Sequence, residues 1–171
     1  QVFESTRGLK VGAEAEFTGH MLEVTLGPGM LSKNYDGLQN DLDKMEGIFL
    51  KRGQYTYPLD KEKKWHFKPI VKVSDEVGPS AWLGEVEENH QPLKIMVPFQ
   101  LHGTYKVKSI VVEGDYTIED TVVVLTNKEG EDIKVNMIQK WPVKKAMTNY
   151  VEKPRPYKLL ETGVRVIDTM N

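Results

Sequence analysis

The stretch GEVEENHQPLKIMVPFQLHGTYKVKSIVVEGDYTIEDTVVVL, residues 84–125, decides the fold of this chain. Its first part places an apolar side chain at every second position, at Leu93, Ile95 and Val97. A period of two is typical of a half-buried β-strand. Pro98 ends this strand, because proline has no N–H to donate to a neighbouring strand.

Two further apolar runs follow in the same stretch, beginning near Val107 and Ile118. Their β-branched side chains favour a pleated sheet. Between them, the dipeptide Gly114-Asp115 predicts a tight turn in which Gly114 adopts a positive φ. We expect the following residues to supply much of the core: Val97, Val107, Ile110, Val112 and Val122.

A similar sequence pattern occurs upstream, where residues 71–75 and Val86 repeat the pattern of residues 111–115 and Val124. Each of the two segments predicts a hairpin unit. Two such units facing each other would bury apolar surface that neither can bury alone. The sequence therefore predicts a mainly β fold, with a barrel-sandwich core at about residues 70–140.

Composition restricts the classes of function that this chain of 171 residues can have. Charged residues make up 28% and apolar residues 39%, which is typical of a globular protein. A net charge of −2 gives no general attraction to nucleic acid or to an anionic membrane. The chain has no cysteine, which excludes disulfides and thiol catalysis. It opens without a methionine and closes on an apolar, helix-like segment, so we expect it to be part of a longer protein.

The amino-terminal part predicts strands and one short helix. Residues 1–31 read as short strands joined by tight turns, the last of them broken by Gly27-Pro28-Gly29. A helix is expected to start near Asp41 and to end before Gly53. Its apolar residues at helical spacing are Leu42, Met45 and Phe49.

Residues 54–69 are aromatic and basic, a combination that can stack on single-stranded nucleic acid. The same aromatics suit a β core whose charges are solvated, and we favour that interpretation. Residues 134–165 carry eight Lys or Arg and two Glu with interspersed prolines, which indicates an extended connector near the carboxyl end. No nucleic-acid partner and no membrane insertion are expected.

No sequence motif predicts catalysis, nucleotide binding or metal binding in this chain. The phosphate-binding pattern G-x-x-x-x-G-K-[ST] does not occur, and the four histidines lack zinc-ligand spacing. Residues 78–82 fail as a nucleophile elbow, because Trp82 stands where the second glycine is required. The carboxylates of Glu85, Glu87 and Glu88 are interpreted as a solvated edge.

The hairpin region resembles the biotinyl and lipoyl carrier type of barrel-sandwich, through residues 85–87, Val97-Pro98, Gly103 and Gly114-Asp115. In such carriers the hairpin presents a lysine for modification. His90 stands at the matching position here, and an imidazole cannot form the amide with lipoate. The resemblance therefore implies the fold without the carrier function.

Motifs at the two ends resemble the rotary ATPases. One group precedes the nucleotide-binding domain, at residues 18–31 and 35–39, and the other resembles the approach to the P-loop, at residues 139–143, 154–157 and 162–169. Roughly a hundred residues lie between the two groups. Such an insertion is characteristic of the catalytic A subunit of V-type and archaeal-type ATPases, where it forms a protruding "bulge" domain.

The resemblance implies a division of the chain into three parts. Residues 1–31 would be the end of an amino-terminal β-barrel, residues 32–143 the bulge domain, and residues 144–171 a connector into a nucleotide-binding domain. A whole subunit of this family binds Mg-ATP, and its P-loop lysine, metal-binding threonine and catalytic glutamate would all lie beyond Asn171. We therefore expect this chain alone to be inactive and to hold no cofactor.

The family resemblance also implies partners and a location. The whole subunit would alternate with B subunits in a ring, contact the central rotor and the peripheral stator stalks, and couple ATP hydrolysis or synthesis to proton or sodium transport. It would be cytoplasmic and peripheral to the membrane. We expect the hairpin residues Glu88, Asn89, His90 and Gln91 to contact another subunit, because they are polar and lie on a rigid scaffold. A stand-alone lipoyl-like adaptor is the alternative.

Overall fold

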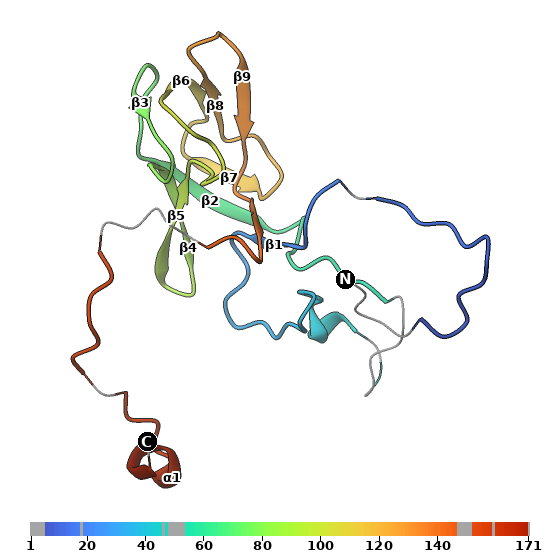
Figure 1. The fold of residues 1–171 in the computed structure, drawn as a ribbon. Helices are drawn as coiled ribbons and strands as arrows, with labels where there is room; N and C mark the ends of the chain where they lie inside the picture. The colour runs from blue at the N-terminus through green and yellow to red at the C-terminus, as the bar shows by residue number, and fades with distance from the viewer. Residues whose placement is uncertain are drawn as a thin grey trace.

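The computed structural model describes residues 6–17, 19–45, 47, 54–146, 152–158 and 160–170. Within these residues the chain is mainly β, with two four-stranded sheets, one two-stranded ribbon and one short α-helix. Figure 1 shows the two sheets above the ribbon, and the carboxyl-terminal segment leading away to helix α1 (Arg165–Met170). The prediction of a mainly β, barrel-sandwich-like fold is confirmed.

The strands pair antiparallel throughout the three sheets. The first sheet has the order β5 (Gln91–Met96), β4 (Trp82–Glu88), β2 (Lys64–Pro69) and β7 (Gly114–Thr117). The second has the order β3 (Glu76–Val77), β6 (Tyr105–Ile110), β8 (Val123–Thr126) and β9 (Asp132–Val135). The ribbon pairs β1 (Glu23–Leu26) with β10 (Gln139–Pro142).

A single apolar cluster fills the space between the two sheets. Alternation along β2 illustrates its origin, because Trp65 and Phe67 are buried while Lys64, His66 and Lys68 on the other face are exposed. The expected core residues Val97, Val107 and Val122 are fully or almost fully buried in this cluster.

Two of the core predictions need correction. Val112 is 77% exposed and Ile110 is only partly buried, because β6 ends at Ile110 and residues 111–113 carry the chain round to β7. Gly114 does not lie in a turn: it begins β7 opposite Phe67, and it lacks the positive φ that a turn would have required. The turn therefore falls a few residues earlier than the dipeptide indicated.

The two hairpin units do not form separate sheets. Strand β2 from the first unit pairs with β7 from the second, and β3 from the first pairs with β6 from the second. Each sheet thus combines strands of both units, so the units interlock rather than stack. This arrangement still buries the shared core, as the pattern predicted.

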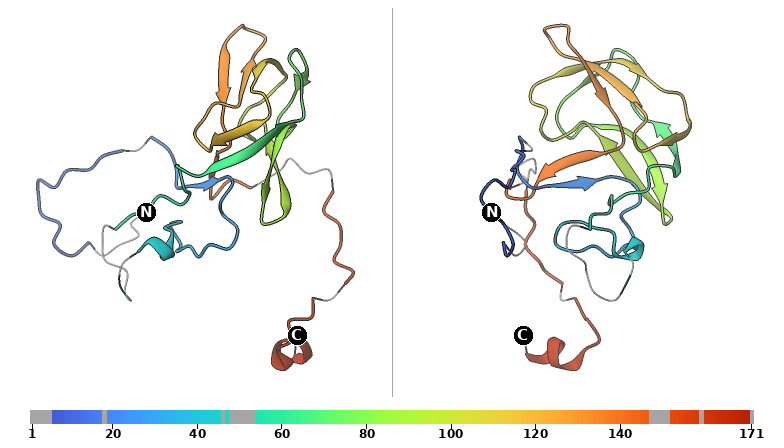
Figure 2. Two further views of the ribbon diagram at one scale, coloured as in Figure 1. Left: turned by 180° about the vertical axis from the view of Figure 1, so that it is seen from behind. Right: turned by 90° about the vertical axis from the view of Figure 1, so that its right-hand side faces the viewer.

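The amino-terminal predictions are wrong in most of the described part. Among residues 6–17 and 19–31, only β1 is a strand, and residues 6–17 loop away from the sandwich (Figure 2). Within residues 41–45, the predicted helix is one 3-10 turn, η1 (Leu42–Lys44), capped by Asp41, whose side chain accepts a hydrogen bond from the Asp43 N–H. None of the residues of η1 is buried, so no packing supports an α-helix there. Residues 1–5, Phe49 and Gly53 lie outside the described residues.

Gly84 is the closest approach between β2 and β4. A Cβ added there would lie 2.3 Å from two ring carbons of Phe67 and 2.8 Å from the carbonyl oxygen of Lys68. Only glycine leaves room for the Phe67 ring at this point of the sheet.

We expect Gly84→Ala to destabilise the fold by about 1–3 kcal/mol, because the Phe67 ring must leave its position in a packed core. Urea denaturation monitored by tryptophan fluorescence measures the change. Gly78→Ala is the matched control: the nearest atom to its added Cβ is 3.8 Å away, so the midpoint should not fall. Equal midpoints for the two variants would contradict the close packing at Gly84.

Candidate interaction site

The β4–β5 hairpin ends in a two-residue turn made by Asn89 and His90. Both residues have positive φ, 49° and 61°, which identifies the type I′ turn that matches the twist of the flanking strands. Glu88 and Gln91 are paired on either side of it. The turn is therefore defined by backbone geometry as well as by its sequence.

Glu88 is buried, contrary to the prediction of a solvated carboxylate edge. It is 5% exposed, and its Oε1 accepts hydrogen bonds from the backbone N–H groups of Gly29, at 2.9 Å, and Leu31, at 3.0 Å. The alternation of β4 places it on the inner face with Val86, while Glu87 faces outward. This alternation was visible in the sequence, but the loop that receives the carboxylate lies 57 to 59 residues away along the chain.

The other three hairpin residues divide between internal and exposed roles. The Asn89 side chain donates to the Ser32 hydroxyl at 3.0 Å. The His90 side chain is 98% exposed, and its Nδ1 lies 3.4 Å from Glu87 Oε1. Gln91 is also exposed. Of the four residues expected to contact another subunit, Glu88 is buried, whereas Asn89, His90 and Gln91 are exposed, and Asn89 also bonds to Ser32.

His90 lies at the hairpin tip, the place from which a biotinyl or lipoyl carrier would present its lysine. An imidazole has no primary amine to acylate, so His90 cannot carry the amide-linked group of such a carrier.

Glu88 separates two grooves beside the hairpin. One, of about 490 Å³, is mostly apolar and runs between β5 and the segment after β1; its lining includes Leu26, Met30, Leu93 and Met137. The other, of about 420 Å³, is polar and is lined in part by the segments around Asp41 and Asp60. Glu88 and Leu31 thus form the wall common to both grooves.

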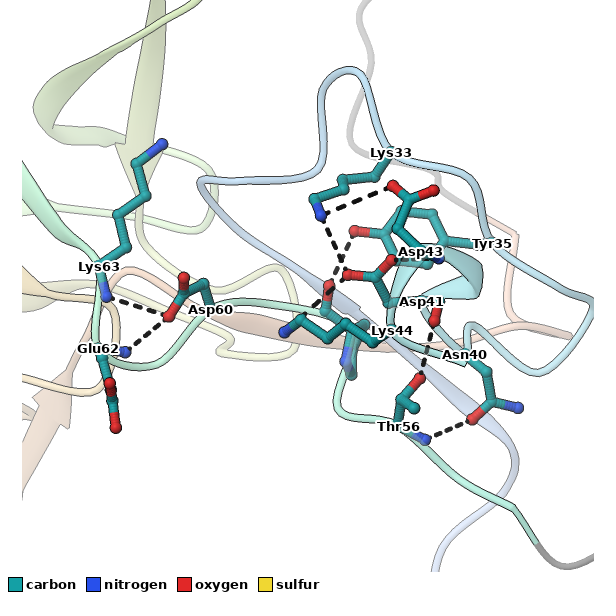
Figure 3. A network of polar contacts seen from close by, with 11 residues as sticks. Lys33, Tyr35, Asn40, Asp41, Asp43, Lys44, Thr56, Asp60, Glu62 and Lys63 are labelled. Carbon is teal, nitrogen blue, oxygen red and sulfur yellow. Dashed lines mark hydrogen bonds and ion pairs between the residues drawn. The ribbon is translucent and has the colours of Figure 1, made fainter. Parts of the chain in front are cut away.

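Asp41 anchors the polar groove (Figure 3). Its carboxylate is buried and lies 3.3 Å from Lys33 Nζ and 4.0 Å from Lys44 Nζ. The pKa of Lys33 is raised, mainly by its contact with Asp41. Each cation neutralises part of the buried charge, which would otherwise be costly to desolvate.

Hydrogen bonds hold the segment around Asp41 against the segment before β2. The Thr56 N–H donates to the Asn40 side chain at 2.9 Å, as Figure 3 shows, and the Tyr35 hydroxyl donates to the Pro58 carbonyl at 2.9 Å. Burial raises the pKa of Tyr35, which keeps this hydroxyl protonated. These bonds fix the wall of the polar groove without making a reactive centre.

His66 forms a second polar cluster on the outer face of the first sheet. Its Nδ1 lies 2.8 Å from Asp115 Oδ1 and its Nε2 lies 3.1 Å from Glu113 Oε1. Carboxylates only accept hydrogen bonds, so both contacts are satisfied only when both ring nitrogens carry a proton. The contact with Asp115, followed by that with Glu113, raises the pKa of His66.

Two of the four aromatic side chains in the segment at residues 54–69 belong to the core, while Tyr55 and Tyr57 are exposed. Trp65 and Phe67 are buried, so their faces are not available to stack on bases. Lys63 Nζ lies 4.1 Å from the centroid of the Trp65 ring, and Lys61 Nζ lies 4.2 Å from the centroid of the Tyr57 ring. Both lysines therefore make cation–π contacts with aromatic rings of their own segment.

The part of the chain that the structure describes has neither a metal-binding cluster nor a membrane-spanning helix. It contains no group of three or more His, Cys, Asp or Glu side chains arranged to hold a metal ion. Within the same residues, no helix has both the length and the apolar character needed to cross a membrane.

Two antiparallel sheets around one core, with an exposed hairpin tip, define a β barrel-sandwich domain. Residues 56–144 match the family model of the ATP synthase alpha/beta subunit barrel-sandwich domain, and the chain belongs to this family.

The most similar curated relatives include three V-type ATP synthase alpha chains. Identity is 47% with that of Treponema denticola, 46% with that of Borrelia hermsii and 41% with that of Protochlamydia amoebophila. Each match covers 99% of this chain but only 29–30% of the relative, so the chain spans less than a third of their length. The resemblance to the A subunit of V-type ATPases is confirmed.

The His66 cluster predicts a pH-dependent contribution to stability. Because the pKa of His66 in the folded chain lies above its ordinary value of 6.5, the stabilising charge is fully present below about pH 6.5. It is lost as the pH rises through the raised folded-state pKa. We expect NMR titration to give a lower His66 pKa in Asp115→Asn than in the parent chain.

His66→Gln is the control for stability. It should remove the contribution of His66 to the pH dependence of the free energy of unfolding and leave the contributions of other groups unchanged. An unchanged His66 pKa in Asp115→Asn would contradict the assignment. The effect on stability should be small and should decrease with added salt, because the cluster is exposed.

Proposed function

We propose that this chain is a non-catalytic part of the A subunit of a V-type rotary ATPase. The observation that carries the proposal is 47% identity over 99% of the chain with a V-type ATP synthase alpha chain. The whole subunit would couple ATP hydrolysis or synthesis to proton or sodium transport. It would alternate with B subunits in a ring that is cytoplasmic and peripheral to the membrane, with a central rotor and peripheral stator stalks as further partners.

We propose the same division of the chain that the sequence indicated. Residues 1–31 would end an amino-terminal barrel, residues 32–143 would form the bulge, and residues 144–171 would lead to the nucleotide-binding domain. The pairing of β1 with β10 supports an inserted domain, because the chain enters and leaves the sandwich at one place. Mg-ATP would bind to the part of the subunit beyond Asn171.

In this proposal the sandwich serves as a scaffold that presents the β4–β5 hairpin to another subunit, in the first place a stator stalk. The interlocked sheets and continuous core resist deformation. His90 and Gln91 stand free at the tip, where a partner could reach them. Binding surfaces commonly lie on such loops of a rigid scaffold.

The chain alone should neither bind nor hydrolyse Mg-ATP. Its sequence lacks the G-x-x-x-x-G-K-[ST] motif, whose loop offers several N–H groups and a lysine to the β- and γ-phosphates. In isothermal titration calorimetry we expect no dissociation constant below about 1 mM, which corresponds to roughly −4 kcal/mol. Micromolar affinity for residues 1–171 would overturn this part of the proposal.

The hairpin contact is tested in the assembled ATPase by the double variant His90→Gly, Gln91→Ser. Glycine tolerates the positive φ of position 90, and both Glu88 and Asn89 keep their internal bonds. We expect an unchanged melting temperature of the isolated chain, with stalk retention in pull-down experiments lowered by about tenfold, the loss of roughly 1.4 kcal/mol of contact.

The exposed Lys128→Ser, in the β8–β9 loop, is the matched control and should leave stalk retention unchanged. Normal retention and coupled ion pumping in the hairpin variant would exclude the hairpin from the contact.

A further inference from the structure

The ribbon β1–β10 is joined to the sandwich on the side of each of its strands. On the β10 side, the rings of Phe99 and Trp141 pack edge to face with centroids 5.5 Å apart, and Gln100 donates to the Lys140 carbonyl at 2.8 Å. On the β1 side, the joining element is the loop of residues 27–32.

The loop after β1 binds the hairpin through a carboxylate. The Gly29 and Leu31 N–H groups both donate to Glu88 Oε1, and neither has another acceptor within the described residues. Gly29 has φ +102°, a conformation that strains other residues, and a Cβ at this position would touch Trp65 at 3.4 Å. The loop backbone is therefore shaped to direct two N–H groups at one oxygen.

Neighbouring contacts hold the loop in the same place. Pro28 is fully buried, Met30 packs against the core, and Ser32 accepts a hydrogen bond from Asn89 beside Glu88. The contact thus involves consecutive residues on both the loop and the hairpin.

The charge of Glu88 is compensated by the two N–H groups rather than by a cation. Across the part of the chain that the structure describes, no Lys, Arg or His forms an ion pair with it. A buried acceptor of this kind is screened little by dissolved salt, in contrast to a surface ion pair. It also requires a defined geometry, because N–H hydrogen bonds weaken steeply when bent.

We propose that Glu88 is a positioning residue that fastens the β4–β5 hairpin to the β1 side of the ribbon. The carboxylate holds the loop of residues 27–32 and the hairpin tip as one body, independently of the Phe99–Trp141 contact on the β10 side. The domain is then oriented by two separate anchors, one on each strand of the ribbon. Its effect on a subunit contact rests on the proposed function, whereas the anchor itself is a property of this chain.

Amide hydrogen exchange followed by NMR on the full chain tests the anchor. In Glu88→Ala, exchange at Gly29 and Leu31 should accelerate by about tenfold or more, because hydrogen bonds to a charged acceptor are lost. Exchange in β6 and β8 should stay as in the parent chain. Glu88→Gln, which keeps an acceptor oxygen without the charge, should give an intermediate rate and covers the case in which the alanine variant fails to fold.

Two further variants make the test specific. Glu87→Ala removes the neighbouring outward-facing carboxylate and should leave the exchange of Gly29 and Leu31 unchanged. Phe99→Ala should accelerate exchange in β10 while sparing Gly29 and Leu31. At high salt, the exchange rates of Gly29 and Leu31 in each Glu88 variant, relative to the parent chain, should be the same as at low salt, since the contact is buried.

Unchanged exchange at Gly29 and Leu31 in both Glu88 variants would overturn the proposal, and so would acceleration spread equally over β6 and β8. These outcomes are distinct from a failure of the proposed function. If the hairpin makes no contact with a stalk, the exchange pattern in the isolated chain is still the one expected here. In that case the hairpin variant His90→Gly, Gln91→Ser leaves stalk retention in the assembled ATPase unchanged.

Discussion

The fold depends on the contact between the Phe67 ring and Gly84. Strand β2 is the only strand of the first sheet that pairs with both a strand of its own half, β4, and a strand of the other half, β7. Phe67 lies over Gly84 of β4 and meets Tyr116 of β7 edge to face, with centroids 6.5 Å apart. One side chain therefore contacts all three strands at the place where β2 and β7 join the two hairpin units within the first sheet.

Periodicity was enough to predict the strands and their inner faces where one side of a sheet is buried. The alternation over Leu93, Ile95 and Val97 appears in β5 and the residue after it, and the family motifs identified the class. Prediction failed at Gly114 and Val112, because a Gly-Asp pair is as compatible with a strand end as with a turn. It also failed over residues 6–22, where strand-like composition meets no partner strand in the described chain.

The position of the hairpin was predicted from the sequence, but the contacts of its side chains were not. Type I′ geometry at Asn89 and His90 follows from a short polar link between two strands, and it fixes which residues stand at the tip. The burial of Glu88 and the pairing of His66 with two carboxylates depend on residues 47 to 59 positions distant along the chain. Local sequence carries no information about such partners, so a tertiary structure was needed to separate the internal carboxylate from the free side chains beside it.

The adjacency of β1 and β10 has a mechanical consequence. Glu23 faces Pro142 at the outer end of the ribbon, and Leu26 faces Gln139 at the end nearest the sandwich. Tension applied between the two chain ends therefore acts first on the Glu23–Pro142 pair. It then breaks the hydrogen bonds between β1 and β10 one after another. Because each bond yields in turn, the force that opens the ribbon is lower than the force that would break all of its bonds at once. The contacts of Trp141 and Lys140 with Phe99 and Gln100 carry part of that force to the sandwich. The ribbon is thus the part of the domain that we expect to open first under tension.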